Sequence, residues 1–195
     1  MKKADKKSEK YFAASRAILE IIEKDGPHKL SHAQISRLSK VSRAWIYEYM
    51  GKNKEELIDI ASEVFASYFT LNNKSVEPNT PEEFMGLLKQ GQDIAFQKAQ
   101  TEPLLLKLYF RFRGTTTPIG SAIKKYEKHW TEYIAKCLVQ AKVLDPQSAL
   151  ATTRAILVLR LGFLHRIATS STPAKEALDA NESMDLVHKQ LLKFN

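Results

Sequence analysis

The chain has 195 residues, and 44% of them are apolar, which is enough for a buried core and excludes global disorder. Its net charge of +8 favours an anionic partner such as nucleic acid or a membrane surface. Its single cysteine, Cys137, excludes an intramolecular disulfide, and its longest apolar stretch, residues 155–164, is about half as long as the roughly 20 residues of a membrane span. No apolar run follows the basic N-terminus as it does in a secretory signal, so we expect a soluble, cytoplasmic protein without a membrane partner.

The first quarter of the chain holds almost all of the excess positive charge. Residues 1–54 contain 13 Lys and Arg against 6 Asp and Glu, whereas residues 55–195 contain 17 against 16. Five of these lysines lie among the first ten residues, so a basic soluble tail is one explanation and a surface for nucleic acid is the other.

Helical periodicity begins directly after this lysine-rich segment. The spacing predicts a first helix over residues 8–24, which Asp25-Gly26-Pro27 ends. One apolar stripe of this helix, expected to face the core, consists of Tyr11, Ala14, Ile18 and Ile21. Two short helices, about residues 31–38 and 42–50, follow it. A longer helix over about residues 53–71 begins with Asn53-Lys-Glu-Glu, a capping-box pattern.

The remainder of the chain predicts a linker and five more helices. The linker covers residues 72–81, where Thr80 caps the next helix and Pro81 lies in its first turn. Later helices begin after Pro103, near Ile119, at Asp145-Pro146 and near Thr172. The sequence therefore predicts an all-α fold of about nine helices. We expect two domains, a helix-turn-helix DNA-binding domain with a basic arm over 1–54 and a helical domain over 55–195.

The segment from Ser31 to Tyr49 has the pattern of a helix-turn-helix. Ser31 and Ser42 are good N-caps for its two helices. We expect Ile46 and Met50 to hold the second helix on the core, which leaves its other faces free for the major groove. The residues expected to pack inward from the first helix and the turn are Ala33, Ile35, Leu38 and Val41.

Several side chains around the second helix suit contacts with DNA. Arg43 can bind a guanine edge bidentately, and the small Ala44 allows close approach and contact with a thymine methyl. Hydroxyl and ammonium groups, and the amides at the helix N-termini, suit phosphate oxygens. The predicted DNA contacts are Ser31, His32, Ser42, Arg43, Ala44, Trp45, Tyr47, Tyr49, Lys52 and Lys54.

The stretch from Ile35 to Met50, followed by Asn53-Lys-Glu-Glu-Leu57, resembles the signature of the TetR family of bacterial transcriptional regulators, and the likeness covers roughly residues 12–70. The resemblance implies a DNA-binding domain of three helices and a larger domain that dimerises and binds a small-molecule effector. It also implies a homodimer on a double-stranded DNA operator, most often a repressor.

Some residues depart from the family pattern and leave the operator sequence open. Lys40 stands where the family usually has a glycine, so we expect it to adopt a left-handed conformation at some cost. His32 replaces an apolar residue, Trp45 a small hydroxyl residue, and Met50 a phenylalanine. Glu48 stands where a basic or neutral residue is common. The link from Gly51 to Lys54 is one residue longer than usual, so either Lys52 or Lys54 can serve as the family's phosphate-binding lysine.

The C-terminal part provides weaker candidates for a ligand pocket and a dimer interface. The last two helices are apolar over more than one face, which suits a four-helix interface between two copies or an ordinary core. The predicted interface residues are Ala155, Leu159, Gly162, Phe163, Met184, Val187 and Leu191. The predicted pocket residues, each of which can equally be a core or surface residue, are Phe96, Tyr109, Phe110, Arg113, Trp130 and Tyr133.

No enzyme signature stands out in the sequence. The five histidines form no metal-binding helix motif, no glycine-rich phosphate loop exists, and Cys137 lies on an apolar stripe without an adjacent base. We therefore expect no catalytic residue, no metal and no cofactor. Two alternatives to a DNA-binding regulator remain, a basic helical protein that binds an anionic membrane surface or a protein partner, and an all-helical enzyme.

Overall fold

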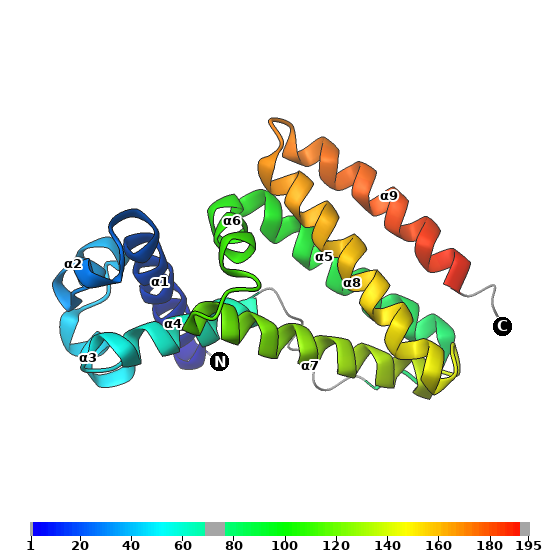
Figure 1. Ribbon diagram of the computed structural model, residues 1–195, viewed down its shortest axis with the longest axis horizontal. Helices are drawn as coiled ribbons and strands as arrows, with labels where there is room; N and C mark the ends of the chain where they lie inside the picture. The colour runs from blue at the N-terminus through cyan, green and yellow to red at the C-terminus, as the bar shows by residue number, and fades with distance from the viewer. Residues whose placement is uncertain (1, 69–76, 192–195) are drawn as a thin grey trace. The chain divides into compact units, whose positions relative to one another are not determined.

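The computed structural model describes residues 2–68 and 77–191, and within these ranges it contains α-helices and no strand (Figure 1). This confirms the predicted all-α fold. A short 3-10 turn, η1 (Pro27–Lys29), follows the first helix. The helices are α1 (Lys2–Asp25), α2 (His32–Ser39), α3 (Arg43–Tyr49), α4 (Lys54–Tyr68), α5 (Pro81–Thr101), α6 (Pro103–Phe112), α7 (Pro118–Gln140), α8 (Pro146–Thr169) and α9 (Pro173–Leu191).

The chain forms two compact units. The first contains α1 to α4 together with residues 111–126, and the second contains α5, the larger part of α6 and the chain from residue 127 onward. Helix α4 therefore belongs with α1, along which it packs, although residues 55–195 were expected to form one domain. The assignment of effector binding and dimerisation to a domain of 55–195 stays a prediction.

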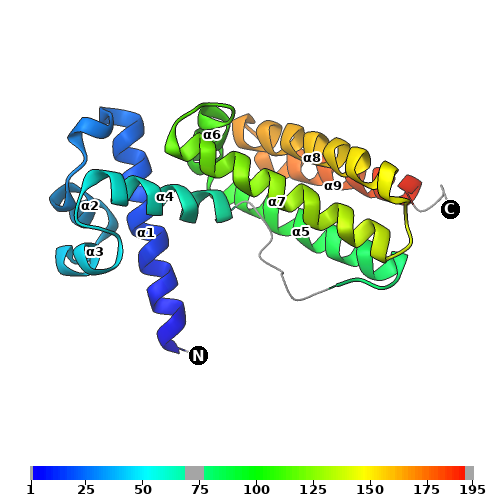
Figure 2. The ribbon, with the colours of Figure 1, turned by 60° about the horizontal axis from the view of Figure 1, so that its bottom comes forward.

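In the second unit α5, α8 and α9 pack against one another, and Figure 2 shows α8 and α9 lying side by side. Large apolar side chains such as Phe84, Phe96 and Leu106 form its interior. Polar contacts also connect α5 with α9: Gln92 Nε2 donates to Asn181 Oδ1 at 2.6 Å, and Lys89 forms an ion pair with Asp185 at 3.3 Å. Among the described helices none is long and apolar enough to cross a bilayer.

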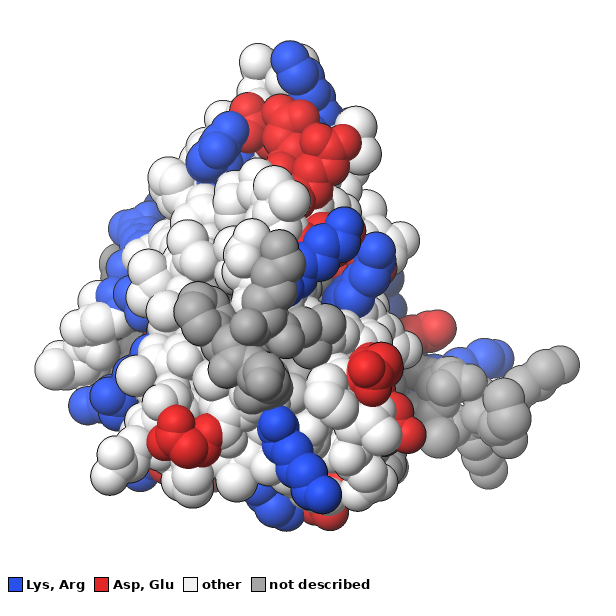
Figure 3. Space-filling model, turned by 90° about the vertical axis from the view of Figure 1, so that its right-hand side faces the viewer, with Lys and Arg blue, Asp and Glu red and all other residues white. Residues whose placement is uncertain are grey.

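Both signs of charge occur together on the face that Figure 3 draws. Acidic and basic side chains lie next to one another in small groups there, and uncharged areas lie between the groups. This face therefore does not carry the one-signed potential that steers a polyanion to a protein surface.

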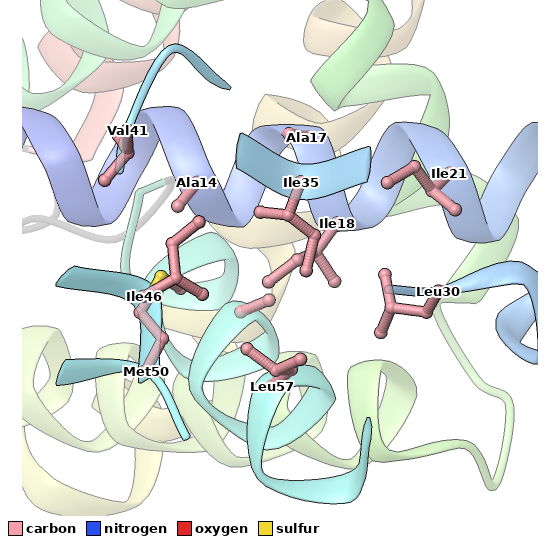
Figure 4. Close-up of a cluster of buried hydrophobic side chains, with 11 residues drawn as sticks. Ala14, Ala17, Ile18, Ile21, Leu30, Ile35, Val41, Ile46, Met50 and Leu57 are labelled. Carbon is pink, nitrogen blue, oxygen red and sulfur yellow. The ribbon is translucent and has the colours of Figure 1, made fainter. Parts of the chain in front are cut away.

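The first unit is built around a small apolar core to which α1, α2, α3 and α4 all contribute (Figure 4). The predicted stripe of α1 is buried at Ala14, Ile18 and Ile21, and Leu57 reaches the same cluster from α4. Together these contacts fix the position of α2 and α3, which are too short to be stable alone.

Side-chain caps begin the helices where the sequence predicted them. Ser31 Oγ accepts from Gln34 N and Ser42 Oγ from Trp45 N, both at 3.3 Å. Thr80 caps α5 in the same way at 3.2 Å, with Pro81 in its first turn. Asp145 accepts from two backbone amides at the start of α8. These caps satisfy amide groups that would otherwise lack a partner.

The structure corrects two parts of the sequence prediction. Helix α1 begins at Lys2 rather than near Ser8, because no Gly or Pro interrupts the lysine-rich segment and its residues tolerate a helix. Leu38 is 48% exposed and Ala33 is also exposed, so the prediction that they pack inward was wrong. In an eight-residue helix Ile35 alone fills the space that the core offers α2. The predicted linker falls mostly outside the described residues.

Candidate nucleic-acid interface

Helix α3 is attached to the core by one face and exposed on the others. Ile46 and Met50, four residues apart, are completely buried, as the spacing predicted. Arg43, Ala44 and Glu48 are exposed, and 47% of Tyr47 is accessible. A short helix anchored by its inner face and free on its outer face has the arrangement that a major-groove reading helix requires.

An open groove of about 580 Å³ lies beside the start of α3. The exposed face of α2 and the first residue of α3 line it, with Ala33, Gln34, Ser36, Arg37 and Arg43 as its walls. Two guanidinium groups therefore flank one groove, and each can grip a phosphate with two parallel hydrogen bonds. The sequence analysis did not include Arg37 among the DNA contacts. Arg37 lies four residues after Ala33, so the two side chains share one face of α2. Because Ala33 was wrongly predicted to be buried, the exposure of this face was not recognised.

The turn between α2 and α3 uses the strained residue that the sequence predicted. Lys40 has φ 60° and ψ 16°, a left-handed conformation in which glycine is preferred. The backbone amide of Val41 then donates to Ser39 Oγ at 3.2 Å, and the Val41 side chain is buried against the core. The prediction for Lys40 and that for Val41 are both confirmed.

His32 connects the beginning of α2 with the end of α3. Its Nε2 lies 2.9 Å from the carbonyl oxygen of Gly51, and its ring stacks on Tyr47 with the ring centroids 3.7 Å apart and an interplanar angle of 2°. The half-buried His32 therefore positions the neighbouring Tyr47 as well as lying close to the predicted DNA surface. These two contacts account for a polar ring at this position.

The N-terminal turns of α1 carry lysines over the aromatic residues of α3. Lys7 Nζ lies 4.3 Å from the centroid of the Tyr49 ring, and Lys10 Nζ lies 5.8 Å from the centroid of Trp45. Tyr11 packs edge-on against Trp45 and donates its hydroxyl hydrogen to the carbonyl oxygen of Tyr49 at 3.0 Å. Sequence reasoning placed Tyr11 on the core stripe of α1 but missed its contacts with α3, which join residues 34 and 38 positions apart.

Electrostatics at the end of α3 favour a protonated tyrosine. A hydrogen bond to Glu48 and the negative charge of that residue raise the pKa of the Tyr49 hydroxyl. A neutral phenol donates a hydrogen bond, whereas a phenolate would repel phosphate. Glu48 itself carries a negative charge on the exposed side of the helix, where it opposes close approach of a phosphate group.

The two candidate lysines in the link between α3 and α4, Lys52 and Lys54, differ in their contacts. Lys54 Nζ donates to the carbonyl oxygen of His28 at 2.7 Å, whereas the exposed side chain of Lys52 has no such contact among the described residues. Asn53 Oδ1 caps α4 through Glu56 N, and the Glu56 carboxylate accepts from Lys52 N, which confirms the capping pattern. Gly51 has φ 125°, and a Cβ atom there would lie 2.4 Å from Glu56 Cβ.

The ten residues predicted to contact DNA all belong to the first unit. Trp45 and His32 are half-buried and take part in packing, and Tyr49 is half-buried beneath Lys7. The exposed members are Ser31, Ser42, Arg43, Ala44, Tyr47, Lys52 and Lys54. The exposed members suit direct contact with DNA, and the half-buried ones also support that surface.

The residues predicted to line a ligand pocket lie mostly inside the second unit. Phe96, Tyr109 and Trp130 are buried, and the Tyr109 hydroxyl donates to Glu127. Burial raises the pKa of the half-buried Tyr133 to about 12. Phe110 packs edge-on against Tyr109 and His165.

The remaining pocket candidate, Arg113, is exposed and belongs to the first unit.

Cys137 is a free cysteine and is buried, as its position on an apolar stripe predicted. Burial raises the pKa of its thiol.

The predicted interface residues differ in exposure. Ala155, Leu159 and Gly162 are exposed on α8, whereas Phe163 and Val187 are half-buried. Met184 is buried within the single chain, so its side chain packs in the interior of its own subunit. Leu191 ends α9, and its side chain lies outside the described residues.

Comparison with known proteins shows the fold. A protein from Syntrophomonas wolfei assigned to the TetR family of transcriptional regulators matches with a TM-score of 0.63 at 19% identity, over 94% of this chain and 95% of its own. A TetR-family regulator from Streptomyces coelicolor has a TM-score of 0.60 at 15% identity, over 94% and 90%. A protein from Shewanella sp. PV-4 assigned to the same family has a TM-score of 0.56 at 16% identity, over 93% and 97%.

The sequence comparisons add nothing to this structural likeness. No protein-family model matches the sequence, and neither does any curated protein. The chain therefore has the fold of TetR-family regulators along nearly its whole length, although its sequence differs widely from each of these three proteins.

Proposed function

We propose that this protein is a sequence-specific DNA-binding transcriptional regulator of the TetR family. One observation carries the proposal: α3 is fixed to the core through the buried Ile46 and Met50, while Arg43, Ala44 and Tyr47 remain exposed on its outer faces. The fold shared with the three TetR-family structures supports the same conclusion. None of the three is described as an enzyme.

In this proposal Arg43 and Ala44 read base edges in the major groove. Both lie in the first turn of α3, which is the part of a reading helix that meets the bases. The guanidinium group of Arg43 fits the O6 and N7 atoms of guanine, and the Ala44 methyl fits that of thymine. Tyr47, whose ring is held by His32, lies one turn further along the helix.

Phosphate contacts fix the position of α3 on the duplex. Arg37 lines the groove beside Arg43, and Lys7 and Lys10 extend the basic surface along α1. Lys52 is the stronger candidate for the phosphate-binding lysine of the link, because Lys54 already donates to His28. Contacts of this kind add affinity but no sequence information.

We further propose that the protein acts as a homodimer and as a repressor that responds to a small molecule bound in the second unit. Large apolar side chains on α8 and α9 are exposed in the single chain, and Val158, Leu178 and Leu186 are each more than half accessible. A second copy would cover such a surface. An effector would act by binding with different affinity to the DNA-bound and the free state.

Selection of bound genomic fragments, followed by gel retardation, tests DNA recognition. We expect a strong preference for selected fragments over random DNA and an affinity that falls steeply as the salt concentration rises. Arg43→Ala should weaken specific binding by about 1–3 kcal/mol and relax base preference at one position. Lys52→Ala should weaken all fragments alike and reduce the salt slope by about 1.

Arg154→Ala is the matched control, because Arg154 is an exposed arginine on α8, a helix of the second unit. It should leave the fragment preference unchanged. Equal retardation of every fragment by the unmodified protein, or full preference retained by Arg43→Ala, would contradict the proposal.

A further inference from the structure

A buried arginine lies on α8. Arg160 is 6% exposed, and its Nη2 atom donates to the carbonyl oxygen of Gly91 on α5 at 3.1 Å. Within the described residues no Asp or Glu carboxylate forms an ion pair with it. A guanidinium has five N–H donors and a permanent charge, and burial without a counter-charge is costly. The surroundings of Arg160 therefore lack the anion that usually accompanies a buried arginine.

The indole of Trp130, which lies beside Arg160, is a donor without an acceptor. The guanidinium lies 5.4 Å from the centroid of the Trp130 ring, and Trp130 is itself 5% exposed. The indole Nε1 of Trp130 is buried and has no hydrogen-bond partner. Native proteins satisfy nearly all such buried donors, so an orphaned N–H beside an unpaired cation points to an absent acceptor.

A second basic side chain, Lys98, lies close enough to Arg160 to feel its charge. Burial and the charge of Arg160 lower the pKa of Lys98, which lies on α5. Burial lowers the pKa of Arg160 to about 10. Both effects mean that burial disfavours the cationic forms of these two side chains, and a bound anion would stabilise those forms.

Apolar side chains adjoin this polar centre. Phe163 lies three residues beyond Arg160, on the same side of α8, and its ring packs edge-on against Phe96 at a centroid distance of 6.4 Å. Phe96 is fully buried on α5. A hydrated inorganic ion would gain nothing from such rings, whereas an anion with an apolar body would bury that body against them.

We propose that Arg160 anchors a binding site for a small organic carboxylate inside the second unit, with the Trp130 indole N–H as a further donor. The guanidinium fork matches the two oxygens of a carboxylate. This inference rests on the proposed function, because it names the chemical class of the effector. Since Arg160 is almost inaccessible, the carboxylate enters when the packing around α8 opens, and binding is thereby coupled to a change in that packing.

Intrinsic fluorescence gives a direct test. The chain has two tryptophans, so Trp45→Phe leaves Trp130 as the reporter. Octanoate and benzoate are the probes, and octanamide and benzamide are their neutral counterparts. We expect a saturable change of Trp130 emission with the carboxylates and at least a tenfold weaker response with the amides. Equal responses to the acids and the amides would overturn the proposal without recourse to any site variant.

Variants then locate the site. In the Trp45→Phe background Arg160→Met should weaken carboxylate binding at least tenfold, whereas Arg154→Met, the same change at an exposed position of α8, should bind like the parent. Arg160→Met should also keep or raise the thermal midpoint in buffer, since it removes an unpaired buried charge. Unchanged carboxylate binding by Arg160→Met would refute the assignment. Trp130→Phe, followed by calorimetry, should weaken binding because the N–H donor is lost.

Gel retardation by the unmodified protein separates this inference from the proposed function. Release of a selected DNA fragment by octanoate or benzoate, lost in Arg160→Met, supports both. Specific DNA binding with no carboxylate binding overturns the inference alone. Carboxylate binding that depends on Arg160, with no DNA preference, upholds the site and overturns the proposed function.

Discussion

The turn between α2 and α3 requires a left-handed backbone conformation at Lys40. Its φ of 60° places a Cβ atom in a backbone region that costs an L-residue about 1 kcal/mol relative to glycine. The side chain is exposed, so it recovers no burial energy in exchange. The lysine adds a positive charge three residues from both Arg37 and Arg43, which line the groove. If the protein binds DNA as proposed, the charge of Lys40 favours that binding, while its backbone conformation lowers the stability of the fold.

Lys40→Gly should raise the free energy of unfolding by about 1 kcal/mol, because glycine adopts this conformation without the Cβ clash. Urea denaturation measures the change. Lys24→Gly is the matched control: Lys24 lies in the last turn of α1, where glycine should lower stability by about 1 kcal/mol. A loss of stability in Lys40→Gly would show that the turn is not strained. The same variant should bind DNA more weakly, since one positive charge is lost.

At the scale of elements, His32 holds α2 to the end of α3. One contact is the 2.9 Å approach of Nε2 to the Gly51 carbonyl oxygen, and the other is the stacking on Tyr47. Two substitutions remove these contacts one at a time. His32→Phe keeps the stack and loses the hydrogen bond, and His32→Gln keeps a donor and loses the stack.

We expect each of these variants to lose about 0.5–1.5 kcal/mol in urea denaturation, and His32→Ala to lose more than either. Gln34→Ala, a change on the same helix but outside both contacts, should cost less. If His32→Ala were as stable as the parent but weakened DNA binding, His32 would be a DNA contact alone.

Helix α9 contains a buried histidine that makes its packing sensitive to acid. Burial is the main cause that lowers the pKa of His188, and Lys89 and Arg160 act in the same direction against the opposing charge of Asp185. Its Nε2 atom is buried without a hydrogen-bond partner in the described part of the chain. The folded state therefore holds His188 neutral, while the unfolded chain takes up a proton below about pH 6.5.

Because the unfolded state binds more protons below that pH, the free energy of unfolding should fall as the pH drops from about 6.5 to 5.5 and should change little above it. Thermal denaturation across this range measures the slope. His188→Gln should flatten it, whereas His129→Gln, at an exposed position of α7, should not. A slope that persists in His188→Gln would assign the pH dependence to other groups.

Local features of these elements were predictable, and contacts between them were not. The caps Ser31, Ser42, Thr80 and Asp145 depend on residues two or three positions away, so the sequence alone predicts them. The start of α1 was missed because lysines carry no apolar period. The burial of Leu38 was predicted wrongly because a short helix has too few apolar positions to show which of its faces is buried.

The candidate site divides in the same way. Ile46 and Met50 fixed the inner face of α3 from their spacing alone, and the structure buries both. The contact of His32 with Gly51 spans 19 residues and that of Tyr11 with Tyr49 spans 38, and no local pattern encodes such pairs. The unpaired state of Arg160 is likewise a property of α5, α7 and α8 packed together, so the apolar stretch around it gave no sign of it.

At the scale of the whole molecule, the exposed apolar side chains of α8 and α9 lead us to expect a dimer formed through these helices. Val158 is 65% exposed and Leu186 62%, and the exposed Ala155 and Gly162 on α8 would let another helix approach closely. Such a surface is costly in water on a monomer. A dimer formed through it would present two copies of α3 to two half-sites of an operator, which multiplies the affinity of one.

Val158→Glu should therefore convert the dimer into a monomer, because each interface would bury two unpaired carboxylates. Sedimentation equilibrium measures the mass, and retardation of a selected DNA fragment should weaken by at least tenfold. The matched control is Val139→Glu, the same substitution at an exposed position of α7 (37% accessible), which should remain dimeric. Circular dichroism must show equal helix content in both variants for the comparison to hold. A folded Val158→Glu protein that is still a dimer would place the interface elsewhere, and an unmodified protein that is a monomer at micromolar concentration would refute the dimer itself.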